Sequence, residues 1–152
     1  MNEDRIVISD DIYQTICAHA EAEYPDEACG ILFVKDEPAG DVIYVKAENA
    51  DPACKKNGHF TIDPLKLFEL EEEYSKQGYS IAGFAHSHPD APCIPSDEDK
   101  KNMIPGLLYL ITGVNKGKSN CLRIWEKDTE EQDIKEIFQN EGSDICNTSI
   151  VF

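Results

Sequence analysis

The sequence predicts an α/β fold in which helices pack on a mixed β-sheet. Several apolar runs of strand length are bounded by turn residues, among them 28–35, 79–88 and 106–114. Two other segments, 11–23 and 63–78, combine apolar residues at helical spacing with residues typical of helix ends. Strands and helices alternate along the chain, which favours one sheet covered by helices over separate blocks of each kind.

The first half of the chain is expected to form a strand, a helix and a hairpin in that order. A short strand covers 5–9, and Asp10 and Asp11 can cap the helix that follows. The apolar stripe of this helix recurs every four residues, at Ile12, Ile16 and Ala20. The continuous apolar run over 28–35 predicts a buried strand, and the alternating segment over about 41–49 predicts its hairpin partner.

The second half is expected to add a long helix, the central strands and a meander. Asp63 can cap the long helix, Pro64 fits its first position, and Gly78 fits the position after its end. The remaining predicted elements are, in chain order, a strand over 79–88, a short helix that starts after Ser96 and is ended by Pro105 and Gly106, a central strand over 106–114, and two strands over 120–127 and 133–140. No element is predicted for the tail after residue 140.

Composition narrows the class of protein and its partners. The chain has 152 residues, which favours a single domain over 1–152. The formal net charge of −16 repels phosphate backbones and anionic headgroups, so nucleic acid and membrane are excluded as expected partners. No apolar run could span a bilayer and no signal peptide is visible at the N-terminus, so we expect a cytoplasmic protein. In a reducing cytosol, without any CxxC pair, all six cysteines are expected to be free thiols: Cys17, Cys29, Cys54, Cys93, Cys121 and Cys146.

Two histidines separated by one residue mark the candidate site. In the expected strand, His86 and His88 project from one face, while Ser87 points to the other. Two imidazoles on one face are a natural chelating pair, and a catalytic zinc site adds a third protein ligand. Asp99, in the first turn of the helix that Ser96 can cap, can supply this ligand. Ser96 and Asp99 also have the spacing of an ordinary helix cap, and that alternative stays open.

Other polar residues and thiols near the motif are given structural roles. The two histidines outside the motif, His19 and His59, are expected to be structural or exposed. Cys93 is interpreted as a partly buried loop residue that could face the cleft, and Cys29 as a core residue. The acidic residues around the motif are expected to be solvated or capping charges, with a supporting role at the site left open for one of them: Asp90, Asp97 and Glu98.

The segments "GFAHSHP" and "PSDED" resemble the signature of the JAMM (MPN-plus) metalloproteases. "YPDEACGILF" and "HFTIDP" are similar to two upstream blocks of the same family. The resemblance implies the JAMM/MPN fold, which is similar to the cytidine-deaminase-like sandwich. It also implies that His86, His88 and Asp99 bind one zinc ion per chain, with a water as fourth ligand. Glu27 matches the general acid/base, because it precedes Ala-Cys-Gly and the strand, and Ser96 matches the residue that polarises the scissile carbonyl.

The chain resembles the small stand-alone prokaryotic branch of the family, because it has no large insertion. The resemblance implies a zinc metallopeptidase that cuts a peptide or isopeptide bond after the C-terminal glycine of a ubiquitin-like or sulfur-carrier protein. Alternatives are a non-catalytic MPN-type scaffold and a general zinc peptidase without carrier specificity. A zinc deaminase is disfavoured, because it requires His-x-Glu followed by Pro-Cys-x-x-Cys. A hydrolase with Cys93 or Cys29 as nucleophile would be recognised by activity that survives chelation.

Overall fold

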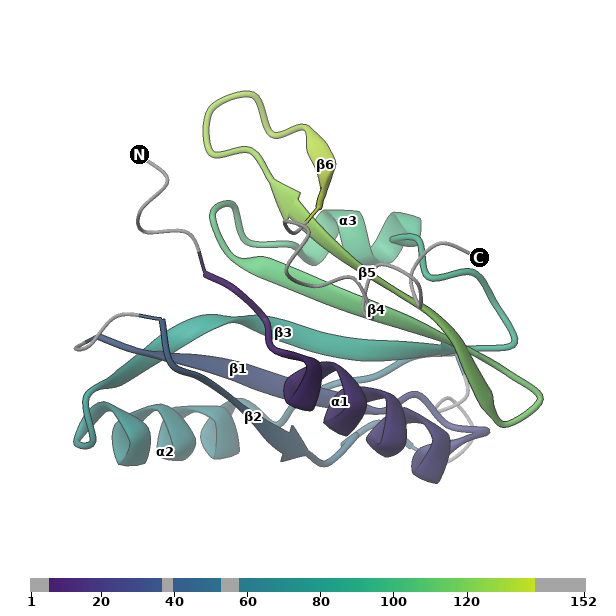
Figure 1. Ribbon diagram of the computed structural model, residues 1–152, viewed down its shortest axis with the longest axis horizontal. Helices are drawn as coiled ribbons and strands as arrows, with labels where there is room; N and C mark the ends of the chain where they lie inside the picture. The colour runs from purple at the N-terminus through teal and green to yellow at the C-terminus, as the bar shows by residue number, and fades with distance from the viewer. Residues whose placement is uncertain (1–5, 37–39, 53–57, 139–152) are drawn as a thin grey trace.

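The computed structural model describes residues 6–36, 40–52 and 58–138, which form a six-stranded sheet with three helices (Figure 1). In chain order the elements are α1 (Asp10–Glu23), β1 (Cys29–Lys35), β2 (Val42–Ala47), α2 (Pro64–Ser75), β3 (Tyr79–Pro89), α3 (Asp97–Asn102), β4 (Leu108–Asn115), β5 (Lys118–Lys127) and β6 (Ile134–Ile137). The strand order is β2-β1-β3-β4-β5-β6, and only β3 and β4 run parallel among these strands, so the predicted mixed α/β fold is confirmed. None of the helices in the described ranges is long and apolar enough to cross a bilayer.

Helices α1 and α2 cover opposite faces of the sheet. Leu32 and Phe33 are consecutive in β1, so their side chains point to opposite faces. Leu32 belongs to the main core cluster with Tyr13 and Ile16 of α1. Phe33 instead stacks on Tyr74 of α2, with ring centroids 4.7 Å apart. In Figure 1, α1 accordingly crosses in front of the sheet. The candidate site lies on the other face, because α2 lines its cavity (below).

The segment before α1 differs from the expected strand. Residues 6–9 are not assigned to a strand, and Ile8 is buried in the core cluster. The apolar pattern that suggested a strand there corresponds to burial of Ile8 against the core. The helix cap is Ser9, whose hydroxyl accepts a hydrogen bond from the Ile12 N–H at 3.3 Å. The predicted caps Asp10 and Asp11 stand in the first turn, where their negative charge suits the helix dipole.

The two other helices begin as predicted but end earlier than their glycine and proline signals suggested. Asp63 caps α2 and Pro64 is its first residue, as expected. Gly78 adopts a φ of +88°, in the turn two residues beyond the Lys76 cap. Helix α3 ends at Asn102, so Pro105 and Gly106 follow its end at a distance. The tail from residue 139 onwards lies outside the described residues.

The prediction that all cysteines are free thiols is wrong for one pair. Cys93 and Cys121 form a disulfide, with Cα atoms 6.3 Å apart, within the range that the bond requires. Cys17 and Cys29 are free, and Cys29 is a core residue as expected. The pairing arises because the loop after β3 lies against β5, a tertiary contact between residues 28 positions apart. The remaining two cysteines, Cys54 and Cys146, lie outside the described residues.

Gly83 is expected to be a stability determinant of the central strands. It pairs with Leu32 and Leu108, and a Cβ atom there would lie 2.0 Å from the Leu108 carbonyl oxygen. Gly83→Ala should therefore lower the free energy of unfolding by roughly 1–3 kcal/mol, the usual effect of overpacking. Gly58→Ala is the matched control, because a Cβ there has no neighbour within 4 Å among the described residues. Denaturant unfolding of both variants tests this, and equal stabilities would contradict it.

Candidate metal centre

Strand β3 presents the two histidines of the motif near its C-terminal end, in the middle of the sheet. It lies between β1 and β4, where His86 pairs with Cys29 and Ile111. His86 and His88 are buried, and their Nε2 atoms lie 3.2 Å apart. Ser87 is buried on the opposite face, as the strand alternation predicts. The structure therefore brings the imidazole pair together as expected.

Helix α3 brings Asp99 to the same point. Ser96 caps the helix, its hydroxyl accepts from the Asp99 N–H at 3.0 Å, and Asp99 Oδ2 accepts from the Ser96 N–H at 3.0 Å. The same Oδ2 atom lies 3.2 Å from His86 Nε2 and 3.0 Å from His88 Nε2. The helix-cap interpretation is therefore confirmed, and it is compatible with the ligand interpretation, because the capping box aims the carboxylate at the histidines.

The three converging atoms fit a single tetrahedral metal ion. At the bond lengths of about 2.0–2.2 Å that zinc favours, two ligands of a tetrahedron lie about 3.3–3.6 Å apart, slightly farther than these three atoms lie from one another. The distances among the two Nε2 atoms and Asp99 Oδ2 are 3.0–3.2 Å. Among the described residues, this is the group of three histidine, cysteine or acidic side chains whose ligand atoms converge, all within 4.8 Å of one another. Two imidazoles and one carboxylate also form a donor set that zinc accepts.

The electrostatics of the three groups favour one positive charge beside the Asp99 carboxylate. Burial lowers the pKa of His86 and so favours its neutral form. Burial would raise the pKa of Asp99, but hydrogen bonds from both histidines hold it well below its usual range. Burial opposes charge on His88 as well, yet Asp99 and the Pro92 carbonyl outweigh it and raise the pKa of His88. A metal ion in the triangle formed by these three side chains would replace the extra proton of His88 as the positive charge beside the Asp99 carboxylate.

Glu27 is held beside the two histidines because its neighbour Ala28 is hydrogen-bonded to Ser87, the residue between them. Ala28 and Ser87 are joined twice: the Ala28 N–H donates to Ser87 Oγ at 2.8 Å, and the Ser87 N–H donates to the Ala28 carbonyl at 3.0 Å. These bonds fix the residue before β1 beside the stretch from His86 to His88. The Glu27 side chain is buried and lines the same cavity as His86 and Asp99. Burial raises the pKa of Glu27 to about 7, which suits proton transfer near neutral pH.

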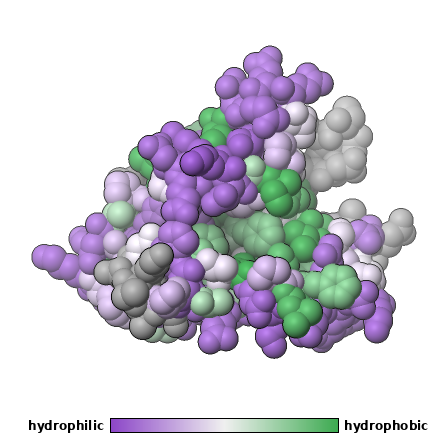
Figure 2. All heavy atoms as spheres, turned by 180° about the vertical axis from the view of Figure 1, so that it is seen from behind, coloured by the Kyte–Doolittle hydropathy of each residue, from purple (hydrophilic) through white to green (hydrophobic). Residues whose placement is uncertain are grey.

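A cavity of about 350 Å³ opens beside these residues, between α2 and α3. Ser96 lies at its rim and is exposed. The Asp99 N–H occupies one lone pair of the Ser96 hydroxyl, so its hydrogen remains available for donation. The rest of the wall is mainly apolar, and Figure 2 shows apolar side chains gathered around a hollow on this face. The apolar lining residues are Phe60, Ile62, Leu67, Phe84, Met103, Ile104, Tyr109 and Ile111.

His59 has the structural role that was expected, and it also belongs to the cavity wall, which the sequence did not indicate. Its Nε2 atom lies 2.6 Å from Glu98 Oε2 and its Nδ1 atom contacts the Asp51 carboxylate. Hydrogen bonds to Asp51 and then Glu98 raise the pKa of His59, so it favours the charged form. Glu98 is accordingly no merely solvated charge, because it ties the start of α3 to the segment that carries His59.

Asn49 is a second residue that sequence reasoning missed. Its side-chain amide donates to the Glu27 and His59 carbonyls, each at 3.0 Å, and its Oδ1 atom accepts from the Thr61 N–H at 3.2 Å. Asn49 thus holds two walls of the cavity in place. An asparagine within a loop has no periodic signal, so only the tertiary structure identifies this role.

Comparisons with known proteins agree with this geometry. The family Prok-JAB, prokaryotic homologs of the JAB domain, matches residues 9–126. A desampylase from Haloferax volcanii is 29% identical over 120 residues, which cover 73% of this chain and 82% of the relative. The solution structure of a protein from Desulfitobacterium hafniense has a TM-score of 0.69 at 28% identity and covers 85% of this chain and 87% of its own. A JAB1/MPN domain protein from Archaeoglobus fulgidus has a TM-score of 0.53 at 20% identity, covering 89% and 95%, and shares the fold.

The family match extends from the cap of α1 almost to the end of β5, and it includes both histidines, Asp99, Ser96 and Glu27. The fold, the converging side chains and this match lead to one conclusion: the chain belongs to the prokaryotic JAB (JAMM-type) family.

Proposed function

We propose that this protein is a zinc-dependent metallopeptidase that hydrolyses a peptide or isopeptide bond after the C-terminal glycine of a ubiquitin-like or sulfur-carrier protein. The observation that carries the proposal is the convergence of His86, His88 and Asp99 on one point beside Glu27. The similarity to a desampylase over most of the chain supports it. We propose one zinc ion per chain, because these three residues form a single site.

The residues of the site divide the work of hydrolysis. A zinc ion held by His86, His88 and Asp99 would supply Lewis-acid chemistry, which lowers the pKa of water from 15.7 to about 7 and polarises a carbonyl. Glu27 accepts the proton of the attacking water as a carboxylate and returns it to the leaving amine as a carboxylic acid. The Ser96 hydroxyl donates a hydrogen bond to the carbonyl oxygen, where negative charge develops.

The structure disfavours a cysteine hydrolase. Cys93 is bonded to Cys121, so it has no thiol to act as nucleophile. Cys29 is fully buried, and burial raises the pKa of its thiol to about 12. A deaminase of the His-x-Glu type is disfavoured because this chain has His88 where that motif requires a glutamate. A non-catalytic scaffold remains the alternative in which the same fold serves partner binding alone.

The shape of the site favours a flexible tail as substrate. His86 and Asp99 are largely buried at the inner end of the cavity, whereas Ser96 lies at the exposed rim. A thin extended segment can reach a buried site of this kind, and glycine lets its backbone approach closely. The carbonyl under attack must come within about 3–3.5 Å of the nucleophile, which a folded segment would prevent. We therefore propose a tail that ends in glycine, recognised in the setting of sulfur transfer or protein deconjugation in the cytoplasm.

Cleavage of glycine-ended carriers is the direct test. Ubiquitin-like sulfur carriers from the same genome, each extended by cysteine or by a short peptide after the terminal glycine, would be incubated with the protein and followed by mass. We expect release of a carrier that ends in glycine, and the reaction should stop when a chelator is added, because the metal site is then emptied.

Two controls give this experiment its meaning. An unfolded protein without a glycine-ended tail should be left intact, and its efficient cleavage would favour a general metallopeptidase. The zinc-loaded protein bound to a carrier without any turnover would favour the scaffold. Either result would contradict the proposed activity.

A further inference from the structure

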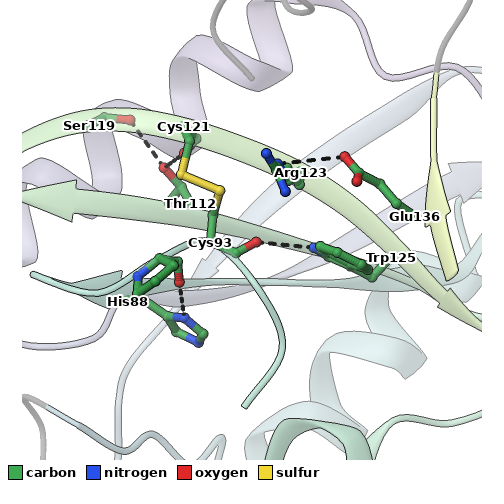
Figure 3. The surroundings of a disulfide bond; sticks show 9 residues. His88, Cys93, Thr112, Ser119, Cys121, Arg123, Trp125 and Glu136 are labelled. Carbon is green, nitrogen blue, oxygen red and sulfur yellow. Dashed lines mark hydrogen bonds and ion pairs between the residues drawn. A yellow bond between two sulfur atoms is a disulfide. The ribbon is translucent and has the colours of Figure 1, made fainter. Parts of the chain in front are cut away.

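The disulfide lies in the same cross-strand row as a residue of the metal centre. His88 in β3 pairs with Gly113 in β4, and Gly113 pairs with Cys121 in β5. Paired residues of neighbouring strands share one face of the sheet, so Cys121 and His88 lie on the same face, with a glycine between them. The disulfide to Cys93 therefore draws the loop after β3 back across the face that carries the histidines (Figure 3).

The missing side chain of Gly113 makes room for this loop. A Cβ atom at Gly113 would lie 3.0 Å from the Ala91 carbonyl oxygen and 3.0 Å from Cys121 Sγ. The loop is thus in close contact with the sheet at this row. It is held there a second time by Trp125, whose indole N–H donates to the Cys93 carbonyl at 3.2 Å (Figure 3). Cys93 is only 3% exposed, so this part of the loop is fixed by the fold.

The anchored loop in turn contacts the His88 ring. The carbonyl of Pro92, directly before Cys93, accepts a hydrogen bond from His88 Nδ1 at 2.7 Å. A carbonyl can only accept, so the hydrogen of His88 must be on Nδ1. When the ring is neutral, the lone pair of Nε2 is therefore free, and Nε2 is the atom that faces His86 and Asp99. When the ring is charged, Nε2 also carries a hydrogen, which it donates to Asp99 and which a metal ion would displace. A partner of this kind fixes the tautomer and the orientation of a metal-binding imidazole.

We propose that the Cys93–Cys121 disulfide is a positioning element of the metal centre, which holds the Pro92 carbonyl against His88 and thereby keeps Nε2 aimed at the metal. The inference rests on the proposed role of His88 as a ligand. The disulfide then has a role at the site beyond general stability. It fixes Cys93, the adjacent Pro92 carbonyl is hydrogen-bonded to His88, and His88 is the proposed ligand.

The test compares zinc affinity with the bridge present and absent. The double variant Cys93→Ser, Cys121→Ser should bind zinc about 10–100-fold more weakly than the oxidised wild type, the usual effect of losing a partner that orients a ligand. Cys17→Ser is the matched control, because it removes a free thiol of α1 and should leave the affinity unchanged. Wild-type protein reduced with a phosphine, which converts the bridge to two thiols, should behave like the double variant without any substitution.

A second measurement reads the tautomer without metal. In the metal-free oxidised wild type, imidazole nitrogen NMR at a pH that leaves the rings neutral should show the hydrogen of His88 on Nδ1. The reduced protein should show a mixture of tautomers, whereas a merely stabilising disulfide would leave this signal unchanged. Circular dichroism confirms that each form is folded.

The outcomes separate this inference from the proposed function. Equal zinc affinity and an unchanged His88 tautomer after loss of the bridge would overturn the inference while leaving the metal site intact. Failure of the oxidised wild type to bind added zinc would overturn the metal site itself, and the tautomer measurement would still decide the role of the bridge.

Discussion

Glu27→Gln should retain zinc and lose hydrolysis by at least about 10²-fold, the scale on which a general base contributes. Glutamine keeps the size of the side chain, so the buried position is filled in the same way. It cannot accept and return a proton, which is the step assigned to Glu27. Zinc affinity should change little, because Glu27 is not among the proposed ligands His86, His88 and Asp99.

The neighbouring acid provides the control for this variant. Asp26 is half-buried and does not line the cavity, so Asp26→Asn should keep both zinc and turnover. Zinc content by elemental analysis and turnover on a proven glycine-ended substrate would be measured for both variants. Near-normal turnover of Glu27→Gln would refute the assigned mechanism. Loss of turnover in Asp26→Asn but not in Glu27→Gln would assign the general-base role to Asp26 instead.

The pH profile gives the same residue a second signature. Burial raises the pKa of Glu27 to about 7, and a bound cation would lower it again. The carboxylate form is lost as the pH falls through this pKa, so kcat/KM of the wild type should decrease on the acidic side of neutrality. The residual kcat/KM of Glu27→Gln should not show this decrease at acidic pH, because the titrating carboxylate is absent.

Much of the framework of the site follows from short-range pattern. The alternation of strand side chains was enough to place His86 and His88 on one face and Ser87 on the other. The Ser-x-x-Asp spacing was enough to predict that Ser96 caps α3 with Asp99 in its first turn. Neither pattern decides between a cap and a ligand, because the answer depends on where the loop between β3 and α3 returns. The family resemblance supplied that step, and it also supplied Glu27.

The features that were missed all depend on long-range packing. Ile8 is buried in a segment that is not assigned to a strand, and no local pattern distinguishes such a segment from a strand of the sheet. The Cys93–Cys121 bridge follows from the register of three strands, which cysteine spacing does not reveal. His59 and Asn49 lie in segments without periodicity, and their contacts to Glu98 and Glu27 join parts of the chain far apart in sequence. Local sequence patterns predict features that depend on residues close together in the chain. The contacts named above depend on the tertiary fold, so local patterns do not predict them.

Asp99 should be required for zinc as well as for turnover. Its Oδ2 atom is the anionic member of the triangle, at 3.0 Å from His88 Nε2 and 3.2 Å from His86 Nε2. Asp99→Asn should lose zinc affinity by more than the roughly 10–100-fold that partners of ligands contribute. The neutral amide can still accept from the Ser96 N–H, so the start of α3 should persist while the charge that attracts the metal is gone.

The comparison that isolates this charge lies in the same helical turn. Asp97 is exposed and outside the triangle, so Asp97→Asn removes one negative charge near the site and should leave zinc affinity unchanged. The double variant His86→Ala, His88→Ala sets the lower limit, since only one ligand remains in it. Competition with a chromophoric chelator would rank all variants. Metal bound at full occupancy in the double histidine variant would place the metal elsewhere, because a single carboxylate at the inner end of this cavity cannot hold zinc in competition with a chelator.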